Sequence, residues 1–296
     1  MSNPNDHHYL PVFYLKRWTG ADSRLVRFHR PYREVVASRP MPKSTGYEEG
    51  LYSLDGFQGG ERQIIETEFF RPVDDKAAVI LHELIDHGAG RLTGDQRSWW
   101  IRFIMSLQLR GPHSLTEIEA LLNHSMEEVF ARQSGDHDCT NPVPEDPAEF
   151  KNACKRLLPQ LIDHPKLGQH VINMLWHVFD LSDAPFTLLT ADRPFASSHG
   201  FRDARCILSV PLSPTHLFVA VNDEKRLEML VRQRRRNTVR NANGLVVKLA
   251  VQNVYGASED HLQFVENRLR RSDEPILPGV ITIGLWESVG HSAPER

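Results

Sequence analysis

Strand-like segments at both ends of the chain enclose a long middle part with helical periodicity, and this order constrains the fold more than any other feature. Up to residue 58, short alternating segments such as RLVRFHR (24–30) are separated by Pro31, Pro40 and Pro42, which favours strands. From 59 to 182 apolar residues recur at helical spacing, and strand-like segments return in 183–296. The order predicts an α+β fold in which N- and C-terminal strands form a mixed or antiparallel sheet packed against a central helical block.

Capping residues and prolines predict where the helices of the middle part begin and end. The predicted N-termini are the capping boxes Thr93–Gln96 and Ser114–Glu117, and the predicted ends are Pro72, Gly88 and Pro159. The helix that follows Thr93 is apolar over much of its circumference, so we expect it at the centre of the molecule. No segment has the composition of a linker, which favours a single domain over residues 1–296.

Composition excludes several classes of protein. The formal net charge is -3, so only a local patch would bind a polyanion. No apolar run approaches the roughly 20 residues that span a bilayer, and the polar N-terminus does not resemble a signal peptide. The three cysteines are widely spaced, as in proteins with reduced thiols. We therefore expect a cytoplasmic protein without a membrane partner, and the oligomeric state is left open.

The segment LHELIDHG (81–88) resembles a zinc-protease motif but lacks its spacing. That motif needs two histidines four residues apart on one helix face. His82 and His87 are five apart, or about 140° around a helix. We expect a solvated polar face here and no structural zinc.

A cationic patch is predicted in RLEMLVRQRRRNTVR (226–240). On one helix Arg232, Arg235 and Arg236 would lie close together, and arginine suits bidentate contact with phosphate. We predict that these three residues bind a phosphate-containing ligand or nucleic acid. The alternative is a solvated helix face neutralised by Glu224 and Glu228.

Polar residues also stand at three distant points where each has a structural explanation of its own. His7 and His8 precede an aromatic, apolar run, and on an extended backbone only one of them would face inward. Arg110 follows the most apolar helix, where a cation suits the helix dipole. Asp192 follows the strand-like segment FTLLT, and it suits either turn chemistry or a site at a strand end.

Four segments together resemble one bacterial family, known as domain of unknown function 4238. HHYLPVFYLKRW (7–18) is similar to its N-terminal signature, LQLRGP (107–112) to its central helix end, TADRP (190–194) to its turn, and VPLSP (210–214) to the strand end that follows. The sequence departs from the family pattern at Trp18, Ala191 and Arg193, where Phe, Ser and Asn are usual. The resemblance implies one fold over nearly the whole chain and no particular reaction.

Because the resemblance groups polar residues from distant points, it implies a shared polar pocket. The predicted catalytic residues are His7, His8, Gln108, Arg110 and Asp192, and the predicted metal ligands are Glu66 and Asp192. The leading hypothesis is a hydrolase of a phosphoester or nucleic-acid backbone that uses Mg²⁺ or Mn²⁺, acting as a bacterial toxin or defence factor. No organic cofactor is indicated. The alternatives are a non-catalytic module that binds a nucleotide, nucleic acid or protein, and a buried network that fixes the N-terminus.

Overall fold

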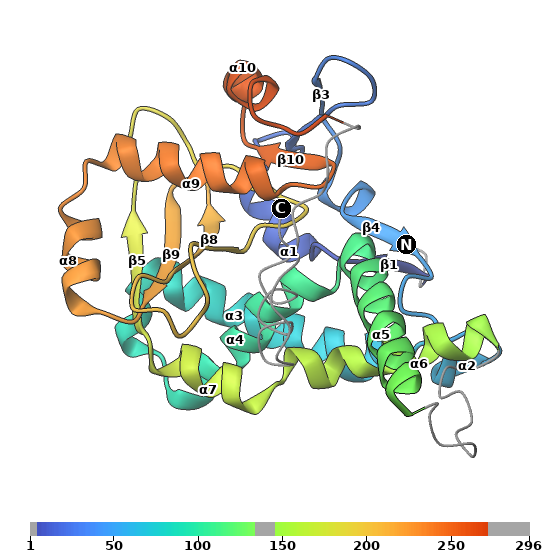
Figure 1. Ribbon diagram of the computed structural model, residues 1–296. Helices are drawn as coiled ribbons and strands as arrows, with labels where there is room; N and C mark the ends of the chain where they lie inside the picture. The colour runs from blue at the N-terminus through green and yellow to red at the C-terminus, as the bar shows by residue number, and fades with distance from the viewer. Residues whose placement is uncertain (1–4, 134–145, 272–296) are drawn as a thin grey trace.

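The computed structural model describes residues 5–133 and 146–271, and its elements follow the predicted order (Figure 1). The N-terminal part contains β1 (Asp6–His8), α1 (Val12–Leu15), η1 (Lys16–Trp18), β2 (Val26–His29), β3 (Val36–Ser38), η2 (Pro42–Ser44) and β4 (Tyr47–Glu49). The middle part contains α2 (Gly59–Arg62), η3 (Glu66–Phe70), α3 (Arg71–His87), η4 (Ala89–Arg91), α4 (Gly94–Leu109), α5 (Pro112–Gln133), α6 (Pro147–Ile162), α7 (Pro165–Asn173) and β5 (Leu175–Asp180). The C-terminal part contains β6 (Thr190–Ala191), β7 (Ala196–Ser197), β8 (Ile207–Ser213), β9 (His216–Val221), α8 (Glu224–Val231), α9 (Arg235–Leu249), β10 (Asn253–Gly256), η5 (Glu259–His261) and α10 (Leu262–Glu266).

The predicted sheet shared by the two ends of the chain is confirmed. Its strand order is β3-β2-β10-β6, and every pairing is antiparallel. Val26 and Phe28 from the N-terminal part and Val254 from the C-terminal part belong to one buried cluster with Val246 of α9. Because residues 224 to 230 positions apart pair in one sheet, the N-terminal strands are part of the main fold.

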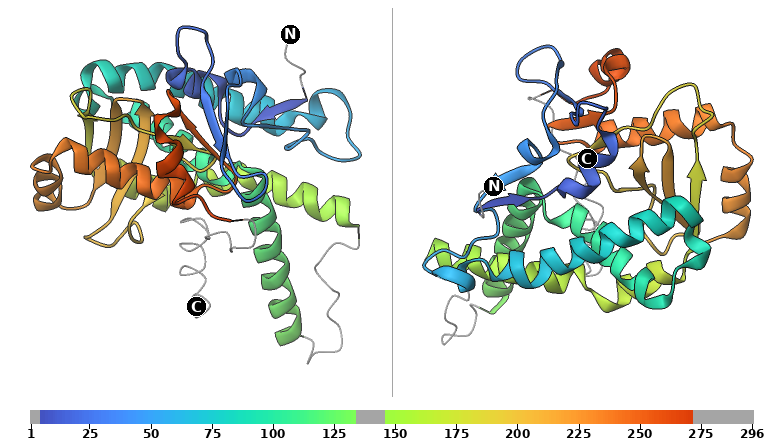
Figure 2. Two further views of the ribbon diagram at one scale, coloured as in Figure 1. Left: turned by 90° about the horizontal axis from the view of Figure 1, so that it is seen from above. Right: turned by 180° about the vertical axis from the view of Figure 1, so that it is seen from behind.

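A second antiparallel sheet, β5-β9-β8-β7, lies between two layers of helices (Figures 1 and 2). Phe218 on one face belongs to a cluster with Trp100 and Phe103 of α4. Leu217 on the opposite face belongs to a cluster with Val239 of α9. Successive residues of a strand point to opposite faces, so β9 contributes to both layers of the core.

The N-terminal segment is docked into the core. Tyr14 and Trp18 are completely buried. The Tyr14 hydroxyl donates to the carbonyl of Pro211 at 2.7 Å, and the Trp18 indole N–H donates to the carbonyl of Leu188 at 3.1 Å. The segment VFYLKRW (12–18), which forms α1 and η1, therefore contacts the C-terminal part of the chain directly.

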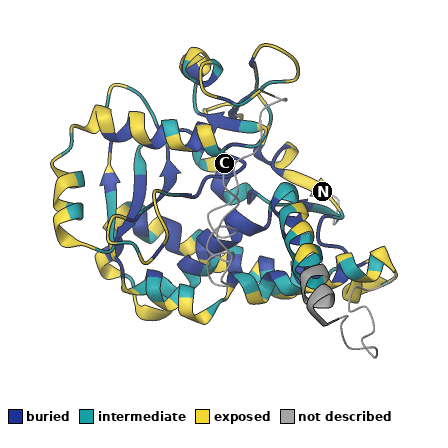
Figure 3. Cartoon of the chain, in the orientation of Figure 1, coloured by how far each residue is buried: buried dark blue, intermediate teal, exposed yellow. Residues whose placement is uncertain are grey.

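Several predicted helix limits are confirmed. α4 begins with the capping box Thr93–Gln96, in which both reciprocal hydrogen bonds are present, and the helix is largely buried (Figure 3). α3 ends at Gly88, whose φ of 71° lies in the left-handed region that glycine tolerates.

Three other predicted limits are wrong, each for a local reason. Pro72 does not end a helix, since it lies in the first turn of α3, where a missing N–H costs little. Pro159 lies inside α6. Ser114 is not an N-cap, because α5 already begins at Pro112 and the Ser114 hydroxyl donates to the carbonyl of Gln108 at 2.9 Å.

The segment 175–180 lies within the predicted helical block, but it forms the strand β5. Its sequence, LWHVFD, is rich in aromatic and β-branched residues, which pack well on a pleated sheet. All six residues pair with β9, so tertiary pairing decides the conformation of this segment.

Within the described ranges, no helix has the length and apolar composition needed to cross a membrane. Cys154 and Cys206 are buried free thiols. Cys139, residues 134–145 of the loop that SGDHDCTNPVPEDP (134–147) predicts, and the last strand predicted over 280–286 lie outside the described residues.

Candidate functional site

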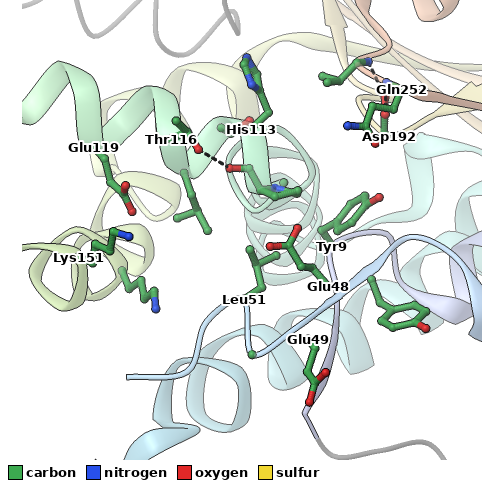
Figure 4. A pocket seen from close by; sticks show the side chains of 18 of the residues that line it. Tyr9, Glu48, Glu49, Leu51, His113, Thr116, Glu119, Lys151, Asp192 and Gln252 are labelled. Carbon is green, nitrogen blue, oxygen red and sulfur yellow. Dashed lines mark hydrogen bonds between the residues drawn. The ribbon is translucent and has the colours of Figure 1, made fainter. Parts of the chain in front are cut away.

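Strands β1 and β4 pair in a two-stranded antiparallel ribbon, called the ribbon below. A pocket of about 630 Å³ opens where this ribbon meets α5, α6 and the loop before β10 (Figure 4). Its volume lies in the range of small-molecule sites. Tyr9 and Glu48 line it on the ribbon side, His113 on the α5 side, and Asp192 and Gln252 on the C-terminal side. The pocket therefore gathers side chains from all three parts of the chain.

A histidine with an oriented carboxylate lines this pocket. The Nε2 atom of His113 lies 3.4 Å from an oxygen of Glu117, one turn further along α5. Arg193 donates to the other Glu117 oxygen at 2.7 Å. Because Glu117 does not cap a helix as we had predicted, its carboxylate is available to hold His113 and Arg193 together.

Burial lowers the pKa of His113 below its ordinary value of 6.5, and the Glu117 carboxylate opposes this shift. The imidazole is consequently neutral near pH 7. A neutral imidazole with one nitrogen beside a carboxylate has the other nitrogen available to accept a proton.

Charge in the pocket lining is mixed, with an excess of carboxylates. The acidic residues are Glu48, Glu49, Asp55, Glu119 and Asp192, and the permanent cations are Lys151, Lys155 and Arg193. Two of these cations are engaged in the fold, since Lys155 donates to the carbonyl of Ser53 at 2.7 Å and Arg193 pairs with Glu117. Figure 4 shows Lys151 and Glu119 together at one end of the pocket.

Of the residues that the sequence analysis grouped as catalytic, only Asp192 lines the pocket. Its two carboxylate oxygens accept hydrogen bonds from the backbone N–H groups of Val251, Gln252 and Asn253 at 2.6 to 2.8 Å. Burial raises the pKa of Asp192, and these three N–H groups oppose the rise. The geometry makes Asp192 the anchor of the loop that leads into β10.

His7 fixes the ribbon to the following loop. Its Nδ1 accepts from the backbone N–H of Tyr52 at 2.9 Å, and its Nε2 donates to the side-chain oxygen of Gln63 at 2.6 Å. His7 is completely buried and stacks on the Tyr52 ring, whereas its neighbour His8 is half-buried. Only one of the two histidines is fully inward, and both of its nitrogens are engaged in the fold.

Arg110, Glu66 and His8 form a polar cluster in which Arg110 is completely buried and the other two residues are half-buried. The Arg110 side chain is completely buried and pairs with Asp74 of α3 at 2.9 Å. Arg110 also acts electrostatically on Glu66 and on His8. Its guanidinium lies 5.7 Å from the ring centres of both Phe70 and Phe103. These cation–π contacts offset part of the free-energy cost of burying the cation.

Several buried polar atoms in this region have no hydrogen-bond partner among the described residues. They are His8 Nε2, Glu66 Oε2, Gln108 Oε1, Arg110 Nε and Arg110 Nη2. Buried polar atoms without a hydrogen-bond partner lower the stability of the folded state. The Arg110 side chain pairs with only one of the two nearby carboxylates, Asp74, and leaves Glu66 without an ion pair to it. The cluster is therefore sensitive to the protonation state of Glu66.

Burial raises the pKa of Glu66 from 4.5 to about 7, and the nearby Asp74 carboxylate adds to the rise. Since the raised pKa belongs to the folded state, Glu66 favours folding fully below pH 4.5 and loses that contribution as the pH rises through about 7. We expect Glu66→Gln to raise the melting temperature by several degrees at pH 8 and to change it little at pH 5. Thermal unfolding of both proteins across this range measures the difference.

Glu68→Gln is the matched control, because Glu68 is exposed on the same π-helical turn. A difference curve between wild type and Glu66→Gln that stays flat from pH 5 to pH 8 would refute the raised pKa.

The two predicted metal ligands lie in different surroundings. Glu66 belongs to the cluster around Arg110, whereas both oxygens of Asp192 face backbone N–H groups. Over residues 5–133 and 146–271, no group of three or more His, Cys, Asp or Glu side chains is arranged to hold a metal ion. In the LHELIDHG segment, His82 and His87 are exposed on α3.

The predicted arginine patch lies on the opposite side of the molecule from the pocket (Figures 1 and 2). Arg232 follows α8 and Arg235 begins α9, so the three arginines do not share one helix as predicted. Arg232 contacts Glu228 at 3.4 Å, and Arg235 contacts Asp183 at 2.9 Å.

Sequence reasoning missed most of the pocket. His113 directly follows the LQLRGP segment, and its i, i+4 spacing to Glu117 was the one local signal that could have indicated a pair. Nothing local marks Tyr9, Glu48 or Lys151, because their proximity depends on how the ribbon meets α5 and α6.

Comparison with known proteins adds one positive finding. A search of the curated proteins and a search of the solved structures found no match. A family model matches residues 6–260, and its description is "Protein of unknown function (DUF4238)".

Proposed function

The chain belongs to the DUF4238 family, and we propose that this member is a hydrolase of phosphoesters whose reaction takes place in the pocket lined by His113. One observation carries the proposal: His113 lines a pocket of about 630 Å³ and is paired with Glu117, which Arg193 holds in turn. A base oriented by a carboxylate that is itself fixed is a common arrangement for activating water or a hydroxyl group. His113 takes the role that we predicted for His7 or His8.

In the proposed reaction, His113 accepts a proton from a water molecule as the water oxygen attacks phosphorus. The bond from phosphorus to the leaving oxygen breaks, and the proton passes from His113 to that oxygen or to solvent. Glu117 stabilises the imidazolium that forms in between. Lys151 lies in the same lining and would offset charge on the phosphoryl oxygens.

The excess of carboxylates in the pocket lining affects the form in which a negatively charged substrate can bind. Five carboxylates against three permanent cations in the lining disfavour a bare phosphate dianion. Mg²⁺ often binds through one or two carboxylates together with substrate phosphates and water. We therefore propose that the phosphoester enters together with Mg²⁺ or Mn²⁺, and the assay below is run with and without each ion.

The test is turnover of bis(p-nitrophenyl) phosphate, nucleotides and labelled single-stranded RNA and DNA by the full chain. We expect His113→Asn to lower the rate about 10²- to 10⁴-fold, as for loss of a general base, without changing the melting temperature by more than a few degrees. His82→Asn is the matched control, since His82 is exposed on α3. Turnover that survives His113→Asn would refute the assignment.

The pH profile gives a separate prediction. Because His113 must be neutral to accept a proton, kcat/KM should rise with pH through a pKa below 6.5 and then level off. Glu117→Gln removes the carboxylate that raises the pKa of His113, so it should move the rising limb to still lower pH. A rising limb that does not move in this variant would count against the pairing of the two side chains.

A non-catalytic binding module is the second candidate. It needs no catalytic group from the family-like segments, in which His7 and Asp192 use their polar atoms within the fold, and the volume of the pocket suits a small ligand. Saturable binding of a nucleotide, nucleic acid or protein in the pocket without turnover, weakened by Lys151→Ala, would support this reading.

A cytoplasmic location and a role as a toxin or defence factor belong to the hydrolase proposal. They predict that expression of the wild type, but not of His113→Asn, slows bacterial growth.

A further inference from the structure

A second pocket, the α8 groove, lies between α8, α9 and β8 and has a volume of about 560 Å³. It is at the opposite end of the molecule from the His113 pocket (Figure 1), and the two linings have no residue in common. The apolar part of its lining is Ile207, Met229 and Leu230, and the polar part is Lys225, Glu228, Arg232, Gln233 and Asn241.

The helix that forms one wall of this groove has little cover of its own. α8 contains no buried residue, and Figure 3 shows it as a mostly exposed helix at the edge of the molecule. Met229 is 53% exposed and Val231 is 52% exposed. Exposed methionine beside an apolar hollow is typical of surfaces that bind other chains, because the side chain adapts its shape.

The lining of the groove carries a small excess of positive charge. Its cations are Lys225 and Arg232, its carboxylate is Glu228, and four more arginines follow in the sequence from Arg234 to Arg240. Arg232 contacts Glu228 at 3.4 Å, but its side chain remains 81% exposed. Such a contact between exposed side chains is weak, so the Arg232 guanidinium can turn toward an anionic partner.

We propose that the α8 groove docks an acidic segment of a partner protein. An apolar side chain of that segment enters between Ile207, Met229 and Leu230, and flanking carboxylates face Arg232 and Lys225. An apolar anchor with a complementary charged rim is a common way of binding a short peptide.

The lining favours a peptide over nucleic acid. The groove lining contains no aromatic side chain on which a base could stack. Its apolar residues have no charge or hydrogen-bond donor that could contact a phosphate backbone. Carboxylates on a peptide would use the same arginines, and only the peptide would also use Met229. Dependence on Met229 therefore distinguishes the two kinds of partner.

The experiment is selection of random displayed peptides on the immobilised full chain, followed by fluorescence anisotropy with the synthetic consensus peptide. We expect the selected peptides to contain Asp or Glu around a Leu, Ile, Met or Phe. Affinity should fall about tenfold or more in Met229→Ser and in Arg232→Glu, and it should also fall as salt rises. Val79→Ser and Arg91→Glu are the matched controls, because both residues are exposed and lie outside the groove lining.

Two results would overturn the proposal. One is selection that yields no peptide whose binding depends on both Met229 and Arg232. The other is tight binding of a labelled single-stranded RNA or duplex DNA that Arg232→Glu abolishes and Met229→Ser leaves unchanged, which would assign the arginines to nucleic acid. His113→Asn should not alter peptide binding, so this test is independent of the proposed hydrolase.

Discussion

Arg110→Ala is expected to lower the free energy of unfolding by about 3–5 kcal/mol, the usual result of breaking a buried ion pair. The Arg110 side chain is completely buried, and its Nη1 donates to Asp74 at 2.9 Å. Its removal leaves Asp74 without its ion-pair partner and takes away the stronger of the two cations that act on Glu66. Chemical denaturation at pH 7 measures the loss.

Arg102→Ala is the matched control, because Arg102 lies on α4, the helix that Arg110 directly follows, and forms a more exposed ion pair with Asp163 at 2.8 Å. An exposed pair contributes about 0–1 kcal/mol. Replacing both partners, as in Arg110→Met with Asp74→Leu, should recover much of the lost stability, since apolar residues of similar size tolerate burial. Equal losses for Arg110→Ala and Arg102→Ala would contradict this account.

Asp192→Ala should destabilise the protein by about 3 kcal/mol or more, because three backbone N–H groups lose their acceptor at about 1–3 kcal/mol each. Val251, Gln252 and Asn253 all donate to this carboxylate, and Asp192 is only 8% exposed. The loop before β10 should also lose protection against hydrogen exchange. Thermal unfolding and hydrogen exchange together measure both effects.

Asp146→Ala is a useful comparison for this second variant. Asp146 caps α6 by accepting from one backbone N–H, that of Ala148, so its removal should cost about 1 kcal/mol. If Asp192→Ala retained full stability and lost turnover, Asp192 would be a catalytic residue as the sequence analysis predicted. Its role as a loop anchor would then be refuted.

The Arg110→Ala and Asp192→Ala variants both test residues of family-like segments whose contacts stabilise the fold, not the chemistry of the pocket. LQLRGP contributes Arg110 to the polar cluster, and TADRP contributes Asp192 to the loop anchor. Between them, Arg193 links the TADRP turn to Glu117 and the Ser114 hydroxyl. These contacts fix the wall of the pocket that His113 lines.

The sequence by itself determined the features that depend on local patterns. Strand-like ends and a helical middle gave the α+β class, because alternation and helical periodicity are set by which residues share a face. The reciprocal bonds of Thr93 and Gln96 and the positive φ of Gly88 involve neighbours a few residues apart. The rule that adjacent side chains on a strand point apart also predicted that only one of His7 and His8 faces inward, and the structure identifies it as His7.

Only the tertiary structure decided which distant groups meet. β5 is a strand because β9 lies beside it, and Glu117 orients His113 because Arg193, 76 residues away, reaches it. The Arg110–Asp74 pair and the pocket between β4 and α5 have the same origin. Burial and pairing of polar groups depend on the surroundings that packing creates, and no local pattern encodes those surroundings.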